Sequence, residues 1–474
     1  MGIKLSEHRN IQLNCSNEIE AWNYLSSTDF NLIQIEERRK LFGKVFPYKI
    51  VRTQESYDIE ADYYIGLDWL VVGKRYIHVE PKVNKELLKI YQELVEQDEF
   101  LENENPNLDK INKARIENEL QDESNLKTVD YLRMLLEVYT SDIPKGQIGN
   151  LAEIHWEDAK IKIQQKDDYL TPFLVIQFLG LLKTIVKKGL KKSYYKVQEN
   201  LTNRVKGKIL VGQHIKQNIF KNRLTSTYCE YQVFGENSLE NQFLKKVFKF
   251  CTHYIQNQPD FFESTKVELN HTINYIRPAF ELIDDSIKEN QLRNFKHNPF
   301  FKEYKEAIKI GSFILKQLGY NISVSSGKEI ETPPFWIDMP RLFELYFYQK
   351  LLKANPNESS KVVFQLKTYG NALDFLIKDG VNSIVIDTKY KLHYQKSHIH
   401  QDIRQVSGYA RLKKVREKCK VSDDFNIACL IVYPLLGGDE INFSLEKIKE
   451  KLSEENEIKA YHKVYKLGIQ LPVL

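Results

Sequence analysis

The sequence predicts an α+β multidomain protein, in which a β-rich and helical N-terminal region is followed by a C-terminal α/β domain. The 474 residues are enough for about two to four domains, each with its own core. Residues 44–83 are dominated by β-branched and aromatic residues and are punctuated by glycines, which is typical of strands joined by turns. Residues 335–435 alternate between helical and strand periodicities in the order α-β-β-β-α-β.

Composition and cysteine usage exclude several classes of protein. The chain is 42% hydrophobic and 28% charged, which is ordinary for a globular protein and excludes collagen-like and largely disordered chains. Its five cysteines form no Cys-x-x-Cys pair, so we expect reduced thiols and no zinc ribbon. Residues 1–20 lack the apolar core of a signal peptide. Residues 172–186 are apolar but interrupted by Gln177 and Lys183, and we expect this run to be too short to cross a bilayer. We therefore expect a cytoplasmic protein without membrane contact.

The chain divides into four predicted segments. Residues 1–84 form a β-rich N-terminal domain. Residues 85–128 contain 12 acidic and 6 basic residues and are predicted to be an acidic helical insertion, either a solvated surface helix or a contact for a partner. Residues 129–294 form a mixed helical and β region with basic character, and residues 295–474 form the C-terminal α/β domain.

The third segment carries most of the positive charge. We expect helix over 129–193, strand around 205–211 and helix again over 236–257. Residues 183–223 contain 12 Lys and Arg and a single acid, Glu199. Such a cluster suits the phosphate backbone of a nucleic acid, and it suits an acidic protein surface equally well.

The C-terminal domain has the clearest pattern of elements. The turn pair Asp379-Gly380 predicts a hairpin between its second and third strands. The elements predicted around this turn are a helix over 339–352, strands over 361–366, 372–377 and 383–390, a helix over 399–415 and a strand over 426–433.

Two acids and a lysine occupy matching positions in this pattern. Asp374 lies within the second strand, Asp387 lies near the end of the third, and Lys389 follows on the same face because strand side chains alternate. The hairpin brings Asp374 beside Asp387, and two adjacent carboxylates repel each other unless a cation lies between them. Oxygen ligands of this kind suit Mg²⁺ or Mn²⁺. The lysine can orient a water molecule, and Glu344 on the preceding helix is a candidate third carboxylate.

These residues resemble a known nuclease signature. Asp374 and the segment Asp387-Thr388-Lys389, on an α-β-β-β-α-β core, are similar to the PD-(D/E)xK (restriction-endonuclease-like) motif. Gln405 and Tyr409 lie on one helical face and resemble the Q-x-x-x-Y element of one branch of these nucleases. The family usually has proline before the first aspartate, where this chain has Leu373.

Further segments narrow the resemblance to McrC proteins, the nuclease subunits of the McrBC modification-dependent restriction systems. The similarity runs in order along most of the chain. The segments that carry it are residues 77–83, 205–209, 240–245, 337–344, 387–391 and 405–410.

The resemblance implies a function in defence against foreign DNA. McrC proteins act with McrB, an AAA+ GTPase, and cut DNA that contains 5-methylcytosine. The chain would then be an Mg²⁺-dependent DNA endonuclease and a type IV restriction enzyme subunit, which stimulates its GTPase partner and acts on modified double-stranded DNA. Residues 1 to about 290 would engage the partner. The sequence has no G-x-x-x-x-G-K-[ST] motif, so we expect no nucleotide bound through a P-loop.

The same resemblance assigns roles to the site residues. Asp374 and Asp387 would bind Mg²⁺, with help from Glu344 and the carbonyl group of Thr388. Lys389 would position the attacking water. These four side chains form the expected catalytic set: Asp374, Asp387, Lys389 and Glu344. Gln405 and Tyr409 would support the site or contact DNA.

Other interpretations remain open at the level of sequence. The chain could be an adaptor that binds DNA and activates a GTPase without cutting, or a nuclease that acts alone. A zinc site is disfavoured, because the three histidines of the polar loop have neither a cysteine nor a clear fourth ligand near them. These histidines are His393, His398 and His400.

Overall fold

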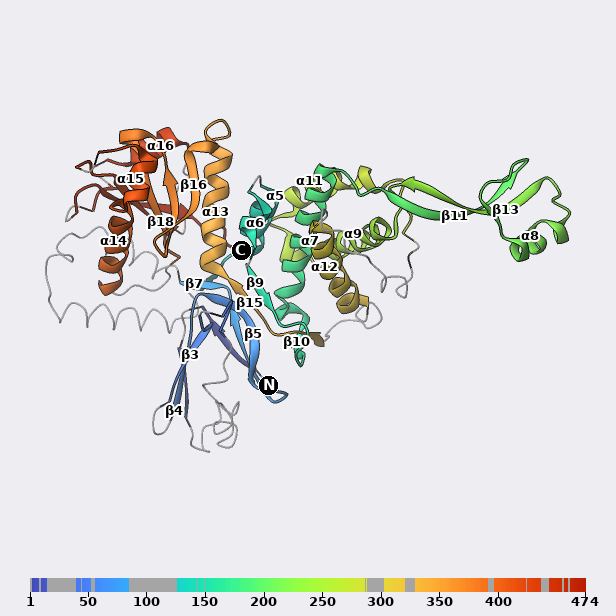
Figure 1. The fold of residues 1–474 in the computed structure, drawn as a ribbon. Helices are drawn as coiled ribbons and strands as arrows, with labels where there is room; N and C mark the ends of the chain where they lie inside the picture. Colours follow the sequence, from blue (N-terminus) through green and yellow to red (C-terminus); the bar gives the residue numbers. More distant parts are fainter. Residues whose placement is uncertain are drawn as a thin grey trace. The chain divides into compact units, whose positions relative to one another are not determined.

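The computed structural model describes most of the chain (Figure 1). The described residues are 2–7, 10–14, 40–43, 45–52, 56–84, 126–141, 143–149, 151–285, 287, 302–319, 329–390, 396–422, 424–435, 443–453, 456–458 and 461–474. They form two compact units, of which unit 1 is Met1–Leu170 with Glu329–Leu474 and unit 2 is Thr171–Lys328. The boundaries differ from those of the four predicted segments. Residues 85–125 of the predicted acidic insertion lie outside the described residues, and Leu126–Thr128 form strand β8.

The first sheet of unit 1 joins segments that are far apart in sequence. Its strand order is β1-β6-β5-β15-β9. The bounds are β1 Gly2–Ser6, β6 Arg75–Glu80, β5 Tyr64–Val71, β15 Phe335–Asp338 and β9 Ala152–Ile154. Strand β1 is parallel to β6, and β15 is antiparallel to β5 and to β9. Gly66 makes the β5–β15 contact possible, because a Cβ atom there would lie 2.1 Å from the carbonyl oxygen of Phe335.

Three smaller sheets complete the β structure of this region. One sheet has three strands in the order β2 (Asn10–Asn14), β4 (Ser56–Ala61) and β3 (Tyr48–Arg52). A second sheet pairs β7 (Lys82–Asn84) with β8, and a third pairs β10 (Ile161–Gln164) with β14 (Glu329–Thr332). The strands β3 to β7 confirm the prediction that residues 44–83 are β-rich. The prediction of helix throughout 129–193 is wrong in part. Helices α5 (Tyr131–Thr140), α6 (Lys145–Ile148) and α7 (Leu170–Lys188) do form, but β9 and β10 lie between them.

The second sheet of unit 1 has the strand order β16-β17-β18-β19-β20. The bounds are β16 Val362–Thr368, β17 Asn371–Ile377, β18 Ile384–Thr388, β19 Ala428–Leu435 and β20 Val464–Gln470. The first three strands pair antiparallel, and β18, β19 and β20 pair parallel. This arrangement confirms the predicted hairpin, and Gly380 in its turn has φ +60°.

Four helices belong to this second sheet region. They are α13 (Met339–Ala354), α14 (Lys396–Ala410), α15 (Lys413–Cys419) and α16 (Leu445–Lys451). The element order α13-β16-β17-β18-α14-β19 is the predicted α-β-β-β-α-β order. Asp338 caps α13 by accepting a hydrogen bond from the backbone N–H of Arg341, and Pro340 lies in its first turn, where a missing N–H costs nothing.

Unit 2 combines a group of helices with a long β-hairpin (Figure 1). Its helices are α7, α9 (Leu239–Asn257), α10 (Pro259–Phe262), α11 (Lys266–Ile276) and α12 (Lys302–Gly319). Helix α9 confirms the helix predicted over 236–257. Helix α12 falls in unit 2, although the sequence analysis assigned residues from 295 onward to the C-terminal domain.

Helix α7 is long and apolar enough to cross a membrane, so the prediction that this run is too short was wrong. Burial distinguishes the two interpretations better than length does, because 72% of its most apolar window is buried inside the protein. Phe173, Leu174 and Phe178 are all fully buried. Such burial is typical of a core helix, whose apolar surface is stabilised by packing against the rest of the fold.

The hairpin, residues 193–235, is called the arm below. Its strands β11 (Ser193–Thr202) and β13 (Ser226–Gly235) pair along ten residues each. The tip of the arm, residues 203–225, contains the short strand β12 (Lys208–Ile209), helix α8 (Val211–Gln217) and the 3₁₀ turn η4 (Ile219–Lys221). The strand predicted around 205–211 is therefore limited to two residues, and a helix begins at Val211.

A buried polar cluster holds the base of the arm. The Asn241 side chain is fully buried and donates hydrogen bonds to the carbonyl oxygens of Lys191 (3.0 Å) and Glu236 (2.7 Å), which flank the two ends of the arm. The Tyr304 hydroxyl donates to Asn241 Oδ1 (2.8 Å), and it accepts from the backbone N–H of Lys191. Each polar group of this cluster is thus paired, which defines where the arm leaves the helices.

Candidate active site

Two adjacent strands bring Asp374 and Asp387 together, as the sequence predicted. Strands β17 and β18 pair Phe375 with Ile386, and continuing this antiparallel register by one residue places Asp374 opposite Asp387. Asp387 is buried, with 1% of its surface exposed, and Asp374 is partly buried. The amide N–H and the hydroxyl of Thr388 each donate to Asp374 Oδ2 at 2.8 Å, so this carboxylate is oriented by the end of the neighbouring strand.

Lys389 lies at the centre of a chain of polar contacts. Its Nζ is 2.7 Å from Asp387 Oδ2 and 2.8 Å from Gln405 Oε1. The Gln405 amide in turn donates to the Tyr409 hydroxyl at 2.8 Å. Gln405 and Tyr409 lie one turn apart on α14, so the helical spacing seen in the sequence places both toward the lysine. The structure thus brings together Asp387, Lys389, Gln405 and Tyr409.

The electrostatics keep this lysine protonated. Burial acts to lower the pKa of Lys389, but the neighbouring Asp387 carboxylate, with Asp402 and Asp374 further away, outweighs that effect and raises the pKa above its usual value. A protonated lysine donates hydrogen bonds and balances negative charge. It therefore suits the orientation of a water molecule or a phosphate oxygen, and not the abstraction of a proton.

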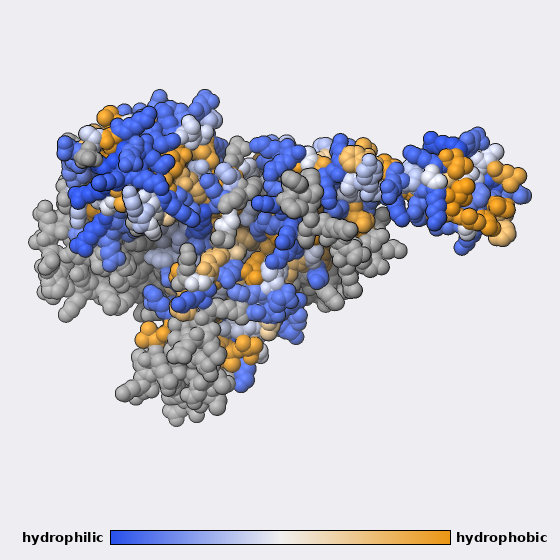
Figure 2. Space-filling model, in the orientation of Figure 1, coloured by the Kyte–Doolittle hydropathy of each residue, from blue (hydrophilic) through white to orange (hydrophobic). Residues whose placement is uncertain are grey.

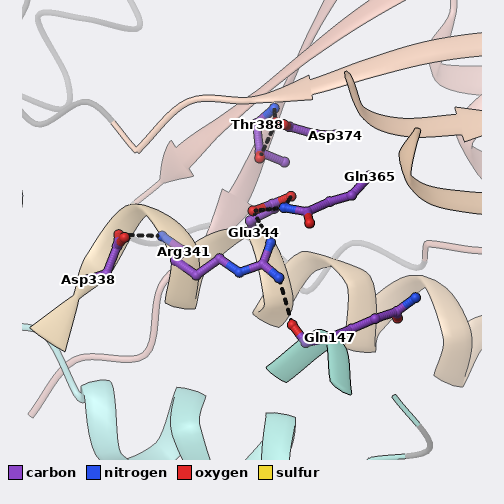
Figure 3. Close-up of polar contacts among 7 residues, drawn as sticks. All are labelled: Gln147, Asp338, Arg341, Glu344, Gln365, Asp374 and Thr388. Atoms are coloured by element: carbon purple, nitrogen blue, oxygen red, sulfur yellow. Dashed lines mark hydrogen bonds and ion pairs between the residues drawn. The ribbon is translucent and has the colours of Figure 1, made fainter. Parts of the chain in front are cut away.

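Glu344 reaches the site from α13, and two side chains hold it (Figure 3). Arg341 Nη1 donates to Glu344 Oε2 at 2.6 Å, and its Nη2 donates to the carbonyl oxygen of Gln147 at 2.6 Å. Gln365 Nε2 donates to Glu344 Oε1 at 3.2 Å from strand β16. Glu344 is only 8% exposed, so its charge depends on these partners.

The carboxylates of the site resist ionisation. Burial raises the pKa of Glu344 to about 7, and the nearby Asp374 adds to this shift. Burial likewise raises the pKa of Asp387 to about 7, with Asp374 contributing and Lys389 opposing. Burial also raises the pKa of Asp374, against the two hydrogen bonds from Thr388. Acids that repel one another in this way gain from a shared cation.

The donor set fits a hard divalent cation with two protein carboxylates. Mg²⁺ commonly takes one or two carboxylates and completes its shell with water and phosphate oxygens, and Asp374 and Asp387 can supply such a pair. Among the described residues, however, no group of three or more His, Cys, Asp or Glu side chains is close enough to hold an ion together. Glu344 is the predicted third ligand, and in this structure Arg341 and Gln365 hold its carboxylate instead.

The sequence analysis missed three residues of this site. Arg341 and Gln365 bind Glu344, and Asp402 on α14 is 5% exposed with Oδ1 4.0 Å from Lys389 Nζ. Asp402 lies one turn before Gln405, so helical spacing alone was a signal that could have found it. Gln365 had no such signal, because its position depends on the backbone of β16.

Gln365 has an unusual backbone conformation for a residue inside a strand. Its φ is +48°, a left-handed value that costs a residue with a side chain roughly 1–3 kcal/mol. The β16–β17 register pairs Phe364 with Phe375 and Leu366 with Leu373, so Gln365 lies across from Asp374 between these two pairs. The strain aims the amide of Gln365 at Glu344, beside the Asp374 carboxylate.

For the Mg²⁺-dependent cleavage that the sequence analysis expects, replacing Gln365 by glycine should raise the Mg²⁺ concentration needed by roughly 10–100-fold, the usual cost of losing a group that orients a ligand. Glycine adopts positive φ without strain, so the unfolding temperature should not fall with the activity. Cleavage is measured across a Mg²⁺ titration, and Lys367→Ala, at an exposed position of the same strand, is the matched control. An unchanged Mg²⁺ requirement in Gln365→Gly would contradict a positioning role for Gln365.

Of the three histidines named in the sequence analysis, only His400 has a described side chain. His400 Nδ1 lies 3.1 Å from the Tyr461 hydroxyl. His393 and the side chain of His398 lie outside the described residues.

The fold and the site together define a class of protein. It is an α+β protein in which carboxylates and an ion-paired lysine meet at the ends of adjoining strands. This arrangement suits metal-assisted chemistry on phosphates. Residues 150–419 match the family model described as McrBC 5-methylcytosine restriction system component, which is more than half of the chain. The chain belongs to this family, and the resemblance to McrC proteins is confirmed at that level.

Two solved structures are similar at low identity. One is a half-complex from a tetradecameric assembly of Thermococcus gammatolerans McrB AAA+ hexamers with bound McrC, with 13% identity, a TM-score of 0.38, and coverage of 99% of this chain and 94% of that chain. The other is the Thermococcus gammatolerans McrBC complex, with 14% identity, a TM-score of 0.28, and coverage of 75% and 88%. No curated protein matches the chain.

Proposed function

We propose that this chain is the endonuclease subunit of a McrBC-type restriction system and that it cleaves modified double-stranded DNA by metal-dependent phosphodiester hydrolysis. The observation that carries the proposal is the cluster of Asp374 on β17, Asp387 on β18 and Lys389 directly after β18, in a member of this family. The C-terminal sheet with its helices is proposed to be a PD-(D/E)xK nuclease domain.

Asp374 and Asp387 would hold Mg²⁺ or Mn²⁺, with the Thr388 carbonyl group and Glu344 as further ligands. When bound, the cation supplies charge stabilisation on the phosphate and a lowered pKa for a coordinated water. Thr388 fixes the Asp374 carboxylate through its amide and hydroxyl. The ion pair with Arg341 and the hydrogen bond from Gln365 would orient the Glu344 carboxylate as a third ligand.

Lys389, held as a cation, orients the attacking water or a phosphate oxygen and balances charge that develops in the transition state. Gln405 accepts a hydrogen bond from Lys389 and limits where its ammonium group can lie. Tyr409 fixes the Gln405 amide. These three residues thus form a support on one side of the carboxylates.

We further propose an AAA+ GTPase as the partner, which this chain stimulates. One similar structure is a complex of McrB AAA+ hexamers with bound McrC. The present sequence contains no P-loop motif, so nucleotide hydrolysis would take place on the partner. Both proteins would act on incoming DNA in the cytoplasm.

Plasmid cleavage tests this function directly. The chain is incubated with methylated or unmethylated plasmid in Mg²⁺, with and without its AAA+ partner and GTP. We expect cutting of methylated plasmid only when partner, GTP and Mg²⁺ are all present. Cutting by the chain alone would instead identify a stand-alone nuclease. Stimulated GTP hydrolysis without cutting under any condition would identify a non-cleaving adaptor.

A further inference from the structure

The turn between β16 and β17 lies at the edge of the second sheet that carries the candidate active site. Strand β17 is antiparallel to β18, so it begins at the edge where β18 ends, at Thr388. Strand β16 is antiparallel to β17 and ends at this same edge, where Thr368 pairs with Asn371. The two residues between them, Tyr369 and Gly370, form the turn. The carboxylate on β17 is three positions beyond Asn371, which is roughly 10 Å at about 3.3 Å per residue.

The backbone of this turn is unusual for the residue that occupies it. Tyr369 has φ +49° and Gly370 has φ +79°. Two residues with positive φ between paired strands are typical of a type I′ turn, in which Asn-Gly is a favoured sequence. Glycine adopts such values without strain, whereas a bulky residue rarely does. Tyrosine thus occupies a position at which the backbone alone would favour asparagine.

Contacts within the protein do not account for this tyrosine. The Tyr369 side chain is 74% exposed, and it forms no hydrogen bond or ring contact with the described residues. A Cβ atom on Gly370 would meet no atom within 4 Å, so the turn projects away from the sheet. In the described part of residues 339–471, the exposed large hydrophobic residues are Tyr369 and Val381. Figure 2 shows that the visible face of this region is largely hydrophilic, so an exposed aromatic ring is uncommon there.

We propose that Tyr369 contacts duplex DNA beside the scissile phosphate, with its ring against the sugars and base edges of a groove. A duplex whose phosphate is held at Asp374 and Asp387 must pass the edge from which this turn projects. A separation of roughly 10 Å corresponds to about three base pairs, which places Tyr369 on the same duplex. Apolar and aromatic side chains pack in grooves and can open a base step. The inference rests on the proposed function, from which it takes duplex DNA as the ligand.

Replacing Tyr369 by asparagine separates a DNA contact from a structural role. The full-length protein binds a fluorescent 30-base-pair duplex in Ca²⁺ in place of Mg²⁺, so that affinity is measured without cleavage. Affinity should fall about tenfold, since the stacking surface of the ring is lost. The unfolding midpoint in urea should stay the same or rise, because asparagine suits the positive φ of the turn. A destabilised fold would instead lower both quantities together.

Two further variants serve as controls. Tyr369→Phe keeps the ring and should bind the duplex like the wild type. Val381→Asn removes an apolar side chain that is 66% exposed, in the turn between β17 and β18 at the opposite edge of the sheet, and should also bind like the wild type. Unchanged affinity in Tyr369→Asn, or an equal loss in Val381→Asn, would overturn the proposal.

Cleavage by the complete system gives an independent readout. Tyr369→Asn should raise the apparent KM for DNA about tenfold and leave kcat nearly unchanged, because the ring binds substrate away from the reacting atoms. If duplex affinity is unchanged while stimulation of the partner's GTPase is lost, the turn is a protein-docking surface and the proposal is wrong. A wild type that binds DNA without cutting it would contradict the proposed function, whereas the affinities in Ca²⁺ would still decide the role of Tyr369.

Discussion

Replacing Asp387 by asparagine is expected to abolish DNA cleavage, with a loss of about a thousandfold or more, because a metal ligand contributes several kcal/mol to the transition state. Asp387 has the central position of the site. It lies opposite Asp374 in the sheet, and its Oδ2 contacts Lys389 Nζ at 2.7 Å. Asparagine keeps the shape of the side chain but removes the charge that attracts both a cation and the lysine.

The loss must be specific to the site. Asp379→Asn, in the turn between the same two strands, removes an equal charge from a carboxylate that pairs instead with Lys361 and Lys449 and should retain activity. Both variants should bind the partner and stimulate GTP hydrolysis normally. Full cutting by a well-folded Asp387→Asn protein would exclude this carboxylate from the chemistry.

The second large effect is on stability. Replacing Trp336 by alanine is expected to destabilise unit 1 by about 3–5 kcal/mol, the usual cost of removing a large buried aromatic side chain. Trp336 is fully buried in β15, within the core shared by the β1-β6-β5 strands and Tyr48. Its indole N–H lies 3.3 Å from the buried Asp68 carboxylate, which would lose this donor.

Urea denaturation followed by far-UV circular dichroism measures this effect without depending on tryptophan fluorescence. Tyr369→Ala is the matched control, because Tyr369 is an aromatic residue of the same unit that is 74% exposed. The midpoint for Trp336→Ala should fall clearly, and that for Tyr369→Ala should change little. Equal midpoints would contradict a stabilising role for the buried Trp336 side chain.

The side chains of the predicted site lie close together in the structure because the signals that predicted their positions are local. Asp374, Asp387 and Lys389 follow from strand alternation and a two-residue turn signal, and Gln405 and Tyr409 follow from helical spacing. In the structure, one chain of polar contacts joins Asp387, Lys389, Gln405 and Tyr409. The positions of Glu344 and its partners were harder to predict from the sequence. Arg341, for example, also donates to the carbonyl oxygen of Gln147, almost two hundred residues earlier in the chain.

The sequence did not predict the short strands that lack a strong periodic pattern. Strand β9 has three residues and β10 has four, and each is stabilised by pairing with a segment more than 150 residues away. In the arm, the β-branched residues around Val205 and Val211 predicted a strand. Helix α8 begins at Val211 instead. Asn218, the residue after this helix, exchanges amide hydrogen bonds with Asn200 of β11.

The sequence by itself determined the fold class, the order of elements around the site and the pairing of two acids with a lysine, since these depend on periodicities of two and 3.6 residues. Only the tertiary structure decided that β15 completes the N-terminal sheet, that Arg341 and Gln365 hold Glu344, and that half of the cations of the basic segment lie at the tip of an arm. These features depend on contacts between distant segments, whose free energy is gained only when the whole chain folds.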